Sequence, residues 1–309
     1  MEMREILCRE LEKLMKENDK IVVIDADVSK ANGTANLRKT FPDRALNVGV
    51  AEQNMASIAA GLSSYGFITI ILSFTPFVTR RICDQIAVSI AYSGQNVKII
   101  GTDPGIAAEL NGGTHMSVED VGIIRSIPTA VIFEPVDNIQ LKKSLPQIIN
   151  YTGLVYIRMF RKNTPDVFSE NYNFDLMRAD ILKEGKDVTI LSTGIMVDES
   201  LKAKKILDEC GIDAEIINIH TIKPIDEEII LKSVTKTQCV VTCENHNIIG
   251  GLRSAVAELL IEKFPIPLES IGINDVFGEV GKMDELKSKF NMTCNDIVKK
   301  VKKVISRKS

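Results

Sequence analysis

The sequence lacks several features that would place it in common functional classes. Its six cysteines form no C-x-x-C pair, which argues against metal binding. The longest apolar stretch, residues 67–72, is far too short to span a bilayer, and early charged residues interrupt any signal peptide. The net charge is −3 and the sequence has no basic stripe, so it lacks the clustered positive charge with which proteins bind nucleic acid. We therefore expect a cytoplasmic protein that binds neither membranes nor nucleic acid.

What is present is an ordinary globular composition. The chain has 309 residues, 45% hydrophobic and 26% charged, which is enough for two domains with full cores. Continuous apolar runs of strand length, such as residues 21–25, alternate with amphipathic helical patterns, such as residues 2–17. This alternation predicts an α/β fold with mainly parallel sheets, and the second domain has room for one reversed edge strand. We place the first domain at residues 1–160, a linker at 161–185 and the second domain at 186–309.

The stretch from Asn47 to Gly66, NVGVAEQNMASIAAGLSSYG, holds the most informative residue of the chain. It predicts a short strand, a turn at Gly49 and an Ala-rich helix, with Glu52 on the first helical turn. An acid at this place can act only through its favourable interaction with the helix dipole, which stabilises the helix by about 0.3–1 kcal/mol. It can also be a half-buried carboxylate that holds or passes a proton. The motif alone leaves both interpretations open.

The segment GVAEQNM, followed by an Ala/Gly-rich helix, resembles the pyrimidine-binding domain of transketolases. Three later segments, IHTIKPID, ENHNIIGGLRSAVAELL and INDVFGEVGKMDELKSKFNMT, resemble the C-terminal domain of the same family. The motifs follow the family's order over nearly all of the chain. The resemblance implies two α/β domains: a thiamine-diphosphate-binding domain of the pyrimidine type with a mainly parallel sheet, and a smaller transketolase C-terminal domain.

The same resemblance assigns residues that bind the cofactor. Glu52 matches the glutamate that hydrogen-bonds a ring nitrogen of the thiamine aminopyrimidine and so promotes removal of the thiazolium proton. Phe74, with Phe77 beside it, matches the aromatic residue that stacks on that ring. Asp27 matches an acid that contacts the cofactor from the neighbouring subunit. Chemistry of this kind needs the protein for orientation and proton placement, because the cofactor itself is the electron sink.

Substrate-binding residues are implied in the same way. The loop that contains His115 resembles the G-E-D-G-x-T-H-Q segment of the family, whose histidine contacts the substrate near the reacting carbons. Glu52 and His115 are therefore the catalytic candidates. Arg158, at the end of a strand, and Arg4 match arginines that hold the substrate phosphate. Arginine suits that role because its planar fork pairs two oxygens at once.

Three positions depart from the family pattern. Asp103 stands where transketolases usually have a histidine that helps to bind the substrate phosphate. Asn111 replaces an aspartate that reads the hydroxyl configuration of the sugar, and Ala31 stands where a serine often contacts phosphate. An ionised Asp103 repels a phosphate dianion unless Arg158 and Arg4 offset its charge, in which case Asp103 would mainly orient an arginine. We treat Asp103 and Asn111 as substrate-binding candidates and expect an altered sugar specificity.

A further absence points to a partner. The family binds the cofactor's diphosphate and its Mg²⁺ in a separate N-terminal domain through a G-D-G motif, and no G-D-G occurs in this sequence. The sequence therefore predicts the C-terminal subunit of a split transketolase, with no metal ligands of its own. We expect it to transfer a two-carbon ketol unit from a ketose or ketose phosphate to an aldose or aldose phosphate.

The expected partner is an N-terminal transketolase subunit whose G-D-G motif holds the diphosphate and Mg²⁺ of thiamine diphosphate. We expect the two subunits to assemble as α2β2. Three alternatives remain open: a 1-deoxyxylulose-phosphate-synthase-like enzyme, the β subunit of a 2-oxo-acid dehydrogenase, and a non-catalytic partner subunit.

Overall fold

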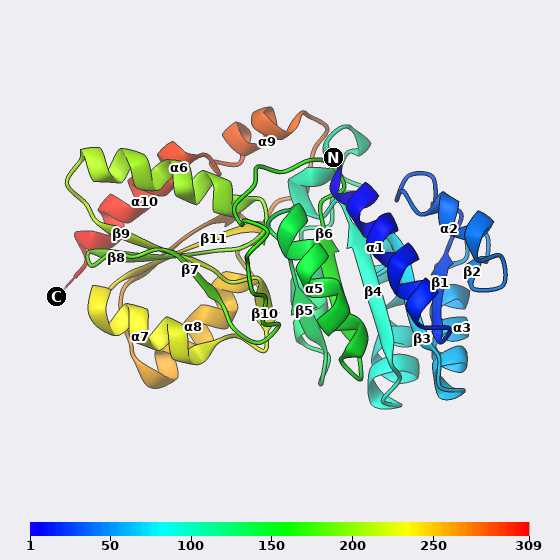
Figure 1. The fold of residues 1–309 in the computed structure, drawn as a ribbon. Helices are drawn as coiled ribbons and strands as arrows, with labels where there is room; N and C mark the ends of the chain where they lie inside the picture. The colour runs from blue at the N-terminus through cyan, green and yellow to red at the C-terminus, as the bar shows by residue number, and fades with distance from the viewer. Residues whose placement is uncertain (309) are drawn as a thin grey trace.

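The computed structural model describes residues 1–308, which form two α/β domains lying side by side (Figure 1). The elements of the first domain are α1 (Met3–Glu17), β1 (Ile21–Asp25), α2 (Ala35–Thr40), β2 (Ala45–Asn47), α3 (Glu52–Ser64), β3 (Ile68–Phe74), η1 (Thr75–Phe77), η2 (Arg80–Ile82), the π-helix η3 (Gln85–Tyr92), β4 (Val97–Thr102), η4 (Gly105–Asn111), α4 (Asp120–Arg125), β5 (Val131–Phe133), α5 (Asn138–Asn150) and β6 (Val155–Met159). The remaining elements are β7 (Asp180–Lys183), β8 (Val188–Ser192), α6 (Met196–Glu209), β9 (Ala214–Asn218), β10 (Thr221–Lys223), α7 (Glu227–Thr237), β11 (Val240–Asn247), α8 (Leu252–Lys263), β12 (Leu268–Ile273), α9 (Met283–Lys289) and α10 (Cys294–Ile305).

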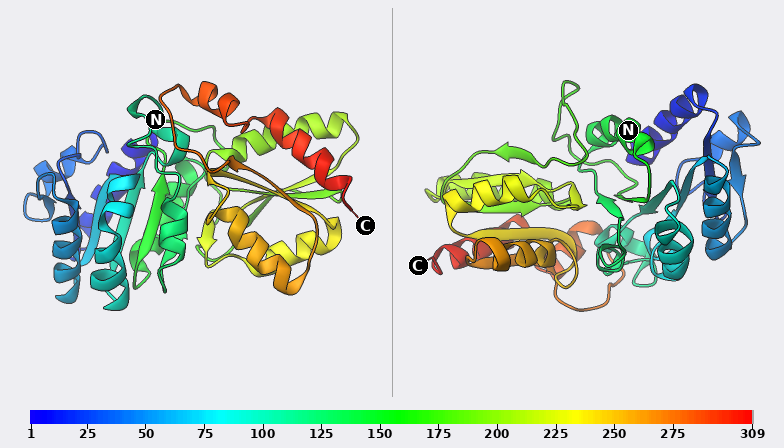
Figure 2. Two further views of the ribbon diagram at one scale, coloured as in Figure 1. Left: turned by 180° about the vertical axis from the view of Figure 1, so that it is seen from behind. Right: turned by 90° about the horizontal axis from the view of Figure 1, so that it is seen from below.

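The first sheet has seven strands in the order β10-β5-β6-β4-β3-β1-β2. Six of them run parallel, and only β10 is antiparallel to its neighbour. Helices α1 and α5 cover one face, and α3, η3 and α4 cover the other (Figures 1 and 2). Because both faces are covered, β1 is buried along its whole length, as its continuous apolar run predicts, and β4 is buried throughout although it contains Lys98.

The second sheet has five strands in the order β12-β11-β8-β9-β7, with α6 and α10 on one face and α7 and α8 on the other (Figure 1). The single reversed strand is β7, which pairs antiparallel with β9 at the sheet edge. The fold class predicted from the sequence is therefore confirmed.

The linker expected at residues 161–185 is wrong in its second half. Phe174 and Leu176 are buried in the core beneath α1 and α5, and β7 is an edge strand of the second sheet. These elements were not predicted because β7 has only four residues, which alternate in exposure at a sheet edge. The segments on both sides of it are rich in turn residues, so no clear strand pattern stands out.

Strand β10 ties the two domains together. It lies between two elements of the second sheet in the sequence, yet it pairs with β5 of the first sheet, Thr221 opposite Phe133. Its three residues are too few to show a periodicity, so the sequence did not predict it. Within residues 1–308, every helix falls short of the length and apolarity needed to cross a membrane.

Candidate functional site

Five loops meet at the carboxyl-terminal edge of the first sheet. Strands β6, β4, β3, β1 and β2 are neighbours and run parallel, so the loops that follow them emerge along one edge. In open α/β sheets this is the edge at which ligands bind. Arg161, Asp103 and Asp27 lie in these loops, Phe74 is the last residue of β3, and Glu52 is the first residue of α3.

Glu52 is the first residue of α3, and it is only 5% exposed. One of its carboxylate oxygens accepts a 2.6 Å hydrogen bond from Arg81 Nη1. The Cζ atom of Arg81 in turn lies over the ring of Phe77, 3.9 Å from the ring centroid. A shallow hollow of about 400 Å³ opens beside Glu52 and Arg81. The carboxylate is thus largely buried, paired with one cation and placed at the wall of an open hollow.

Phe74, Phe77 and His115 form an aromatic cluster next to this carboxylate. The His115 ring lies edge-on to both phenylalanines, with centroids 5.3 Å from Phe74 and 5.2 Å from Phe77. Partial burial, with the positive charges of Arg81 and Arg161 nearby, lowers the pKa of His115. Its imidazole is therefore neutral at neutral pH and has one nitrogen to donate and one to accept a proton.

Asp103 lies directly after β4, and both its carboxylate oxygens face Arg161. The backbone N–H of Arg161 donates to Oδ1 at 3.1 Å, and the Arg161 Nε donates to Oδ2 at 2.5 Å. Burial raises the pKa of Asp103, and the hydrogen bonds and charge of Arg161 offset part of that rise. Asp103 is 2% exposed, which argues against direct contact with a substrate and favours the alternative that it orients an arginine. Its carboxylate instead orients Arg161, whose Cζ lies 4.8 Å from the centroid of the Phe74 ring.

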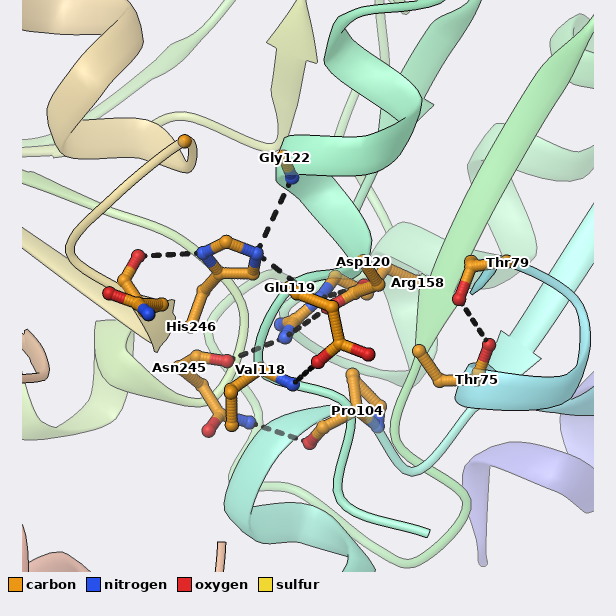
Figure 3. A network of polar contacts seen from close by, with 12 residues as sticks. Thr75, Thr79, Pro104, Val118, Glu119, Asp120, Gly122, Arg158, Asn245 and His246 are labelled. Carbon is orange, nitrogen blue, oxygen red and sulfur yellow. Dashed lines mark hydrogen bonds and ion pairs between the residues drawn. The ribbon is translucent and has the colours of Figure 1, made fainter. Parts of the chain in front are cut away.

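The assignment of Arg158 to the substrate phosphate is wrong. Its side chain is completely buried, and every nitrogen of its guanidinium donates to a protein partner, Asp120 and Asn245 among them (Figure 3). The Nε atom donates to Asp120 Oδ2 at 2.7 Å, Nη1 donates to Glu134 at 2.7 Å, and Nη2 donates to the Asn245 carbonyl at 2.5 Å. Burial alone would lower the pKa of Arg158, but the carboxylates of Asp120 and Glu134 outweigh it and raise that pKa. Arg158 therefore joins the two domains and cannot reach a ligand.

The other predicted residues lie around the same sheet edge. Arg4 donates to the carbonyl of Ala31 at 3.0 Å, and Arg161 donates to the same carbonyl at 3.0 Å, so the two arginines converge. Asp27 has a positive φ of 65° and accepts a hydrogen bond from Asn47 at the end of β2. Asn111 is exposed at the end of η4, in the loop that leads to His115.

Two arginines of the site, Arg81 and Arg161, were not predicted from the sequence. A usable signal existed for Arg161, since β6 reads as a strand covered on both faces and its residue Arg158 must then be buried. The first arginine beyond the strand end, Arg161, is the one that can face a ligand. Arg81 lies in a short 3₁₀ turn, for which the sequence offers no comparable pattern.

No group of three or more His, Cys, Asp or Glu side chains within residues 1–308 is arranged to hold a metal ion. The site described above consists of two buried carboxylates, Glu52 and Asp103, an aromatic cluster with a neutral histidine, and three arginines, Arg4, Arg81 and Arg161. Such a set can hold a flat heteroaromatic ring against Glu52 and an anionic group near Arg161.

Comparisons with known proteins identify the family of both domains. Residues 1–167 match the family model for the transketolase pyrimidine-binding domain, and residues 177–297 match that for the transketolase C-terminal domain. The 6-deoxy-6-sulfo-D-fructose transketolase subunit SqwH of Clostridium sp. (strain MSTE9) is 51% identical over 294 residues, covering 95% of this chain and 91% of that protein. The 1-deoxy-D-xylulose-5-phosphate synthase of Desulforudis audaxviator is 31% identical over 96% of this chain, but the match covers only 47% of the synthase.

A solved structure described as a split-gene transketolase, an inactive β4 tetramer, superimposes with a TM-score of 0.93. It is 41% identical in sequence, and the match covers 100% of both chains. A transketolase of Pichia stipitis shares the fold with a TM-score of 0.82 at 19% identity, and the match covers 46% of that chain. The transketolase family depends on thiamine diphosphate. With both of its domains matched in order, the chain belongs to the transketolase family.

Proposed function

We propose that this chain is the subunit of a split transketolase that binds the aminopyrimidine half of thiamine diphosphate. The assembled enzyme would transfer a two-carbon ketol unit from a ketose to an aldose. The observation that carries this proposal is the position of Arg81, which contacts both Glu52 and Phe77. The buried carboxylate and the aromatic cluster therefore belong to one site. A pocket that binds the aminopyrimidine ring needs both, the aromatic side chains to pack on the ring and the carboxylate to place a proton on it.

The residues present fit this half of the cofactor. Glu52 has a second carboxylate oxygen that can hold a proton against a ring nitrogen, while its first oxygen pairs with Arg81. Phe74 and Phe77 offer flat apolar faces against which a heteroaromatic ring can pack. His115, neutral at neutral pH, can exchange a proton with a substrate hydroxyl. When bound, thiamine diphosphate supplies the nucleophilic carbon and the electron sink of ketol transfer.

We assign the diphosphate and Mg²⁺ to a separate N-terminal subunit with a G-D-G motif. The sequence of this chain contains no such motif, and residues 1–308 contain no cluster of metal ligands. The homologue of known structure is described as inactive when it forms a tetramer of β chains alone. An assembly of the α2β2 type would supply the missing half of the cofactor site.

The surface beside Glu52 supports the presence of such a partner. Residues 53–79 and 85–97 contain no Asp, Glu, Lys or Arg, in a chain that is 26% charged. Helices α3 and η3 pack together on the outer face of the first sheet, and their exposed residues include Tyr92, which is 91% exposed. Surface helices normally carry charge on their solvent face, so an uncharged face next to a half-site suits a subunit contact.

Cofactor binding by the separated chain tests the assignment to a partner. We expect isothermal titration calorimetry to detect little or no binding of thiamine diphosphate to this chain alone, because the charged end of the cofactor has no site. After addition of a purified N-terminal subunit, binding that requires Mg²⁺ and ketol transfer should both appear. Micromolar, Mg²⁺-dependent binding to the chain alone would overturn the split-site proposal.

The substrate we propose is a ketose with an anionic group at its far end, a phosphate or a sulfonate. The inference of an anionic group rests on Arg161. Asp103 fixes this arginine beside Phe74, and 14% of its side chain stays exposed. Its convergence with Arg4 on the Ala31 carbonyl adds a second positive charge nearby. The name of the SqwH relative, a sulfofructose transketolase, makes a sulfonated ketose the first donor to try. The synthase alternative is less favoured, since that relative shares less sequence and is about twice as long as the match.

A substitution at Arg161 tests the substrate class. In Arg161→Gln, kcat/KM for an anionic ketose should fall by roughly 10–100-fold, because a charge-assisted hydrogen bond contributes about 1.5–3 kcal/mol. A ketose of the same length without the anionic group should be used at an unchanged rate. The matched control is Arg178→Gln, which removes a 58% exposed arginine of the second domain. An equal loss for both ketoses would remove Arg161 from the anion site.

A further inference from the structure

One side chain of the second domain is inserted into the loop that builds the substrate side of the site. Asn245 lies near the carboxyl end of β11 and is 1% exposed. Its Oδ1 accepts a 2.9 Å hydrogen bond from the backbone N–H of Ile106. Its Nδ2 donates to the carbonyl of Pro104 at 2.9 Å (Figure 3). The backbone carbonyl of Asn245 accepts the hydrogen bond from Arg158. All three polar groups of this residue that face the first domain are therefore occupied.

The loop is shaped around this side chain. Gly105 lies between the two residues that Asn245 holds, and its φ of +53° is a conformation that glycine adopts without strain. A Cβ atom built on Gly105 would approach Asn245 Oδ1 to 2.2 Å, so no other residue fits while Asn245 is in place. The adjacent strand end reinforces the contact, because the N–H of Asn247 donates to the carbonyl of Val118 at 2.9 Å.

The held turn continues directly into the anion site. Pro104 follows Asp103, whose positive φ of 52° and N–H bond to the Met159 carbonyl set the direction of its carboxylate. That carboxylate holds Arg161 through its backbone N–H and its Nε. A short path of fixed contacts thus runs from Asn245 through the Pro104 carbonyl and Asp103 to the guanidinium of Arg161.

We propose that Asn245 is a positioning residue for substrate binding. By holding residues 104–106 it fixes the Asp103 carboxylate, and Asp103 then keeps Arg161 at the distance from Phe74 at which it can meet the substrate's anionic group. The second domain thereby contributes to substrate recognition without touching the substrate. The inference rests on the proposed function, because it requires Arg161 to bind an anion.

The test is Asn245→Ala in the enzyme assembled with its N-terminal subunit. This variant removes both side-chain hydrogen bonds and keeps the backbone carbonyl that Arg158 needs. We expect KM for the anionic ketose to rise about tenfold with a smaller change in kcat, and the kinetics of the uncharged ketose to stay as in the wild type. The matched control is Asn247→Ala, since Asn247 lies on the same strand and its amide bonds Asp275 instead of the loop.

The double variant Asn245→Ala/Arg161→Gln separates this inference from the proposed function. If Asn245 acts through Arg161, the double variant should be no worse with the anionic ketose than Arg161→Gln alone. If Arg161→Gln discriminates between the two ketoses but Asn245→Ala lowers both alike, the positioning role is refuted while the anion site stands. If Arg161→Gln does not discriminate, the proposed anion site itself fails.

Hydrogen–deuterium exchange on the wild-type chain gives a measurement that does not depend on a variant folding. The amide of Ile106 bonds a side chain buried between two domains, so it should exchange as slowly as amides of the neighbouring strand β4. Exchange of Ile106 as fast as that of the exposed residues around Asn111 would show that Asn245 does not hold the loop, and would overturn the proposal.

Discussion

Replacement of Glu52 by glutamine is expected to lower kcat of the assembled enzyme by about 10²–10⁴, the usual contribution of a general acid–base group. Glutamine keeps the size and shape of the side chain but has no carboxyl group to hold or release a proton. The loss should fall on kcat, because the proposed role of Glu52 is proton placement on the bound cofactor. Steady-state kinetics with the N-terminal subunit and saturating thiamine diphosphate measures it.

The structure offers a control for the alternative that Glu52 serves only its helix. Glu227 is also an acid in the first turn of a helix, α7, and its half-exposed side chain pairs with Lys263. Glu227→Gln should cost only the dipole and surface-pair contribution, under about 1 kcal/mol, and leave kcat unchanged. If Glu52→Gln behaves like Glu227→Gln in both turnover and melting temperature, Glu52 is a helix-end acid and has no part in catalysis.

The sequence predicted best those parts of the fold whose cause is local or repetitive. Strand β1 has the bounds that its apolar run indicates, and α3 begins at Glu52. Both effects act over a few neighbouring residues, since burial on two faces demands an unbroken apolar run and a helix start demands a turn before it. The resemblance then supplied the family, which the comparisons show independently.

What the sequence could not supply depends on contacts between distant segments. Asp103 is buried because Arg161, 58 residues away, covers it, and no local pattern indicates that pairing. Strand β10 joins the first sheet because β5 has a free edge beside the second domain. Asn245 lies in a segment with no catalytic motif, yet it contacts residues 139 and 141 positions earlier in the chain. Such pairings become visible only when both domains are in place.

The contrast between Arg158 and Arg161 shows how burial decides between two similar residues. The two arginines are three residues apart at the end of β6, and the resemblance to the family favoured Arg158, which lies inside the strand. A strand covered on both faces buries every side chain it carries, so a charged residue there must find buried partners of opposite charge. Arg158 has found Asp120 and Glu134. Arg161, two residues past the end of β6, keeps part of its surface accessible.

The second large effect is expected from Arg158→Met, as a loss of stability of about 3–5 kcal/mol. Removal of the guanidinium leaves Asp120 and Glu134 buried without their cation. Arg158 also donates to the carbonyl of Asn245, so the loss falls where β11 meets the first sheet (Figure 3). An ion pair in the interior adds little when it is intact, but breaking it exposes the full desolvation cost of the charges that remain. The melting temperature should fall by roughly 10 °C, and calorimetric or fluorescence melting measures it.

Two further variants show whether the cause is the unpaired charge. In Arg158→Met/Asp120→Asn/Glu134→Gln the buried carboxylates are gone, so part of the lost stability should return. Arg178→Gln breaks an ion pair whose two side chains are 58% and 78% exposed, and it should change the melting temperature by no more than a degree or two. If Arg158→Met melts like Arg178→Gln, Arg158 does not hold the domains together, and an accessible role for it would return to consideration. If the triple variant melts no higher than Arg158→Met, lost packing and not stranded charge is the reason that this position needs arginine.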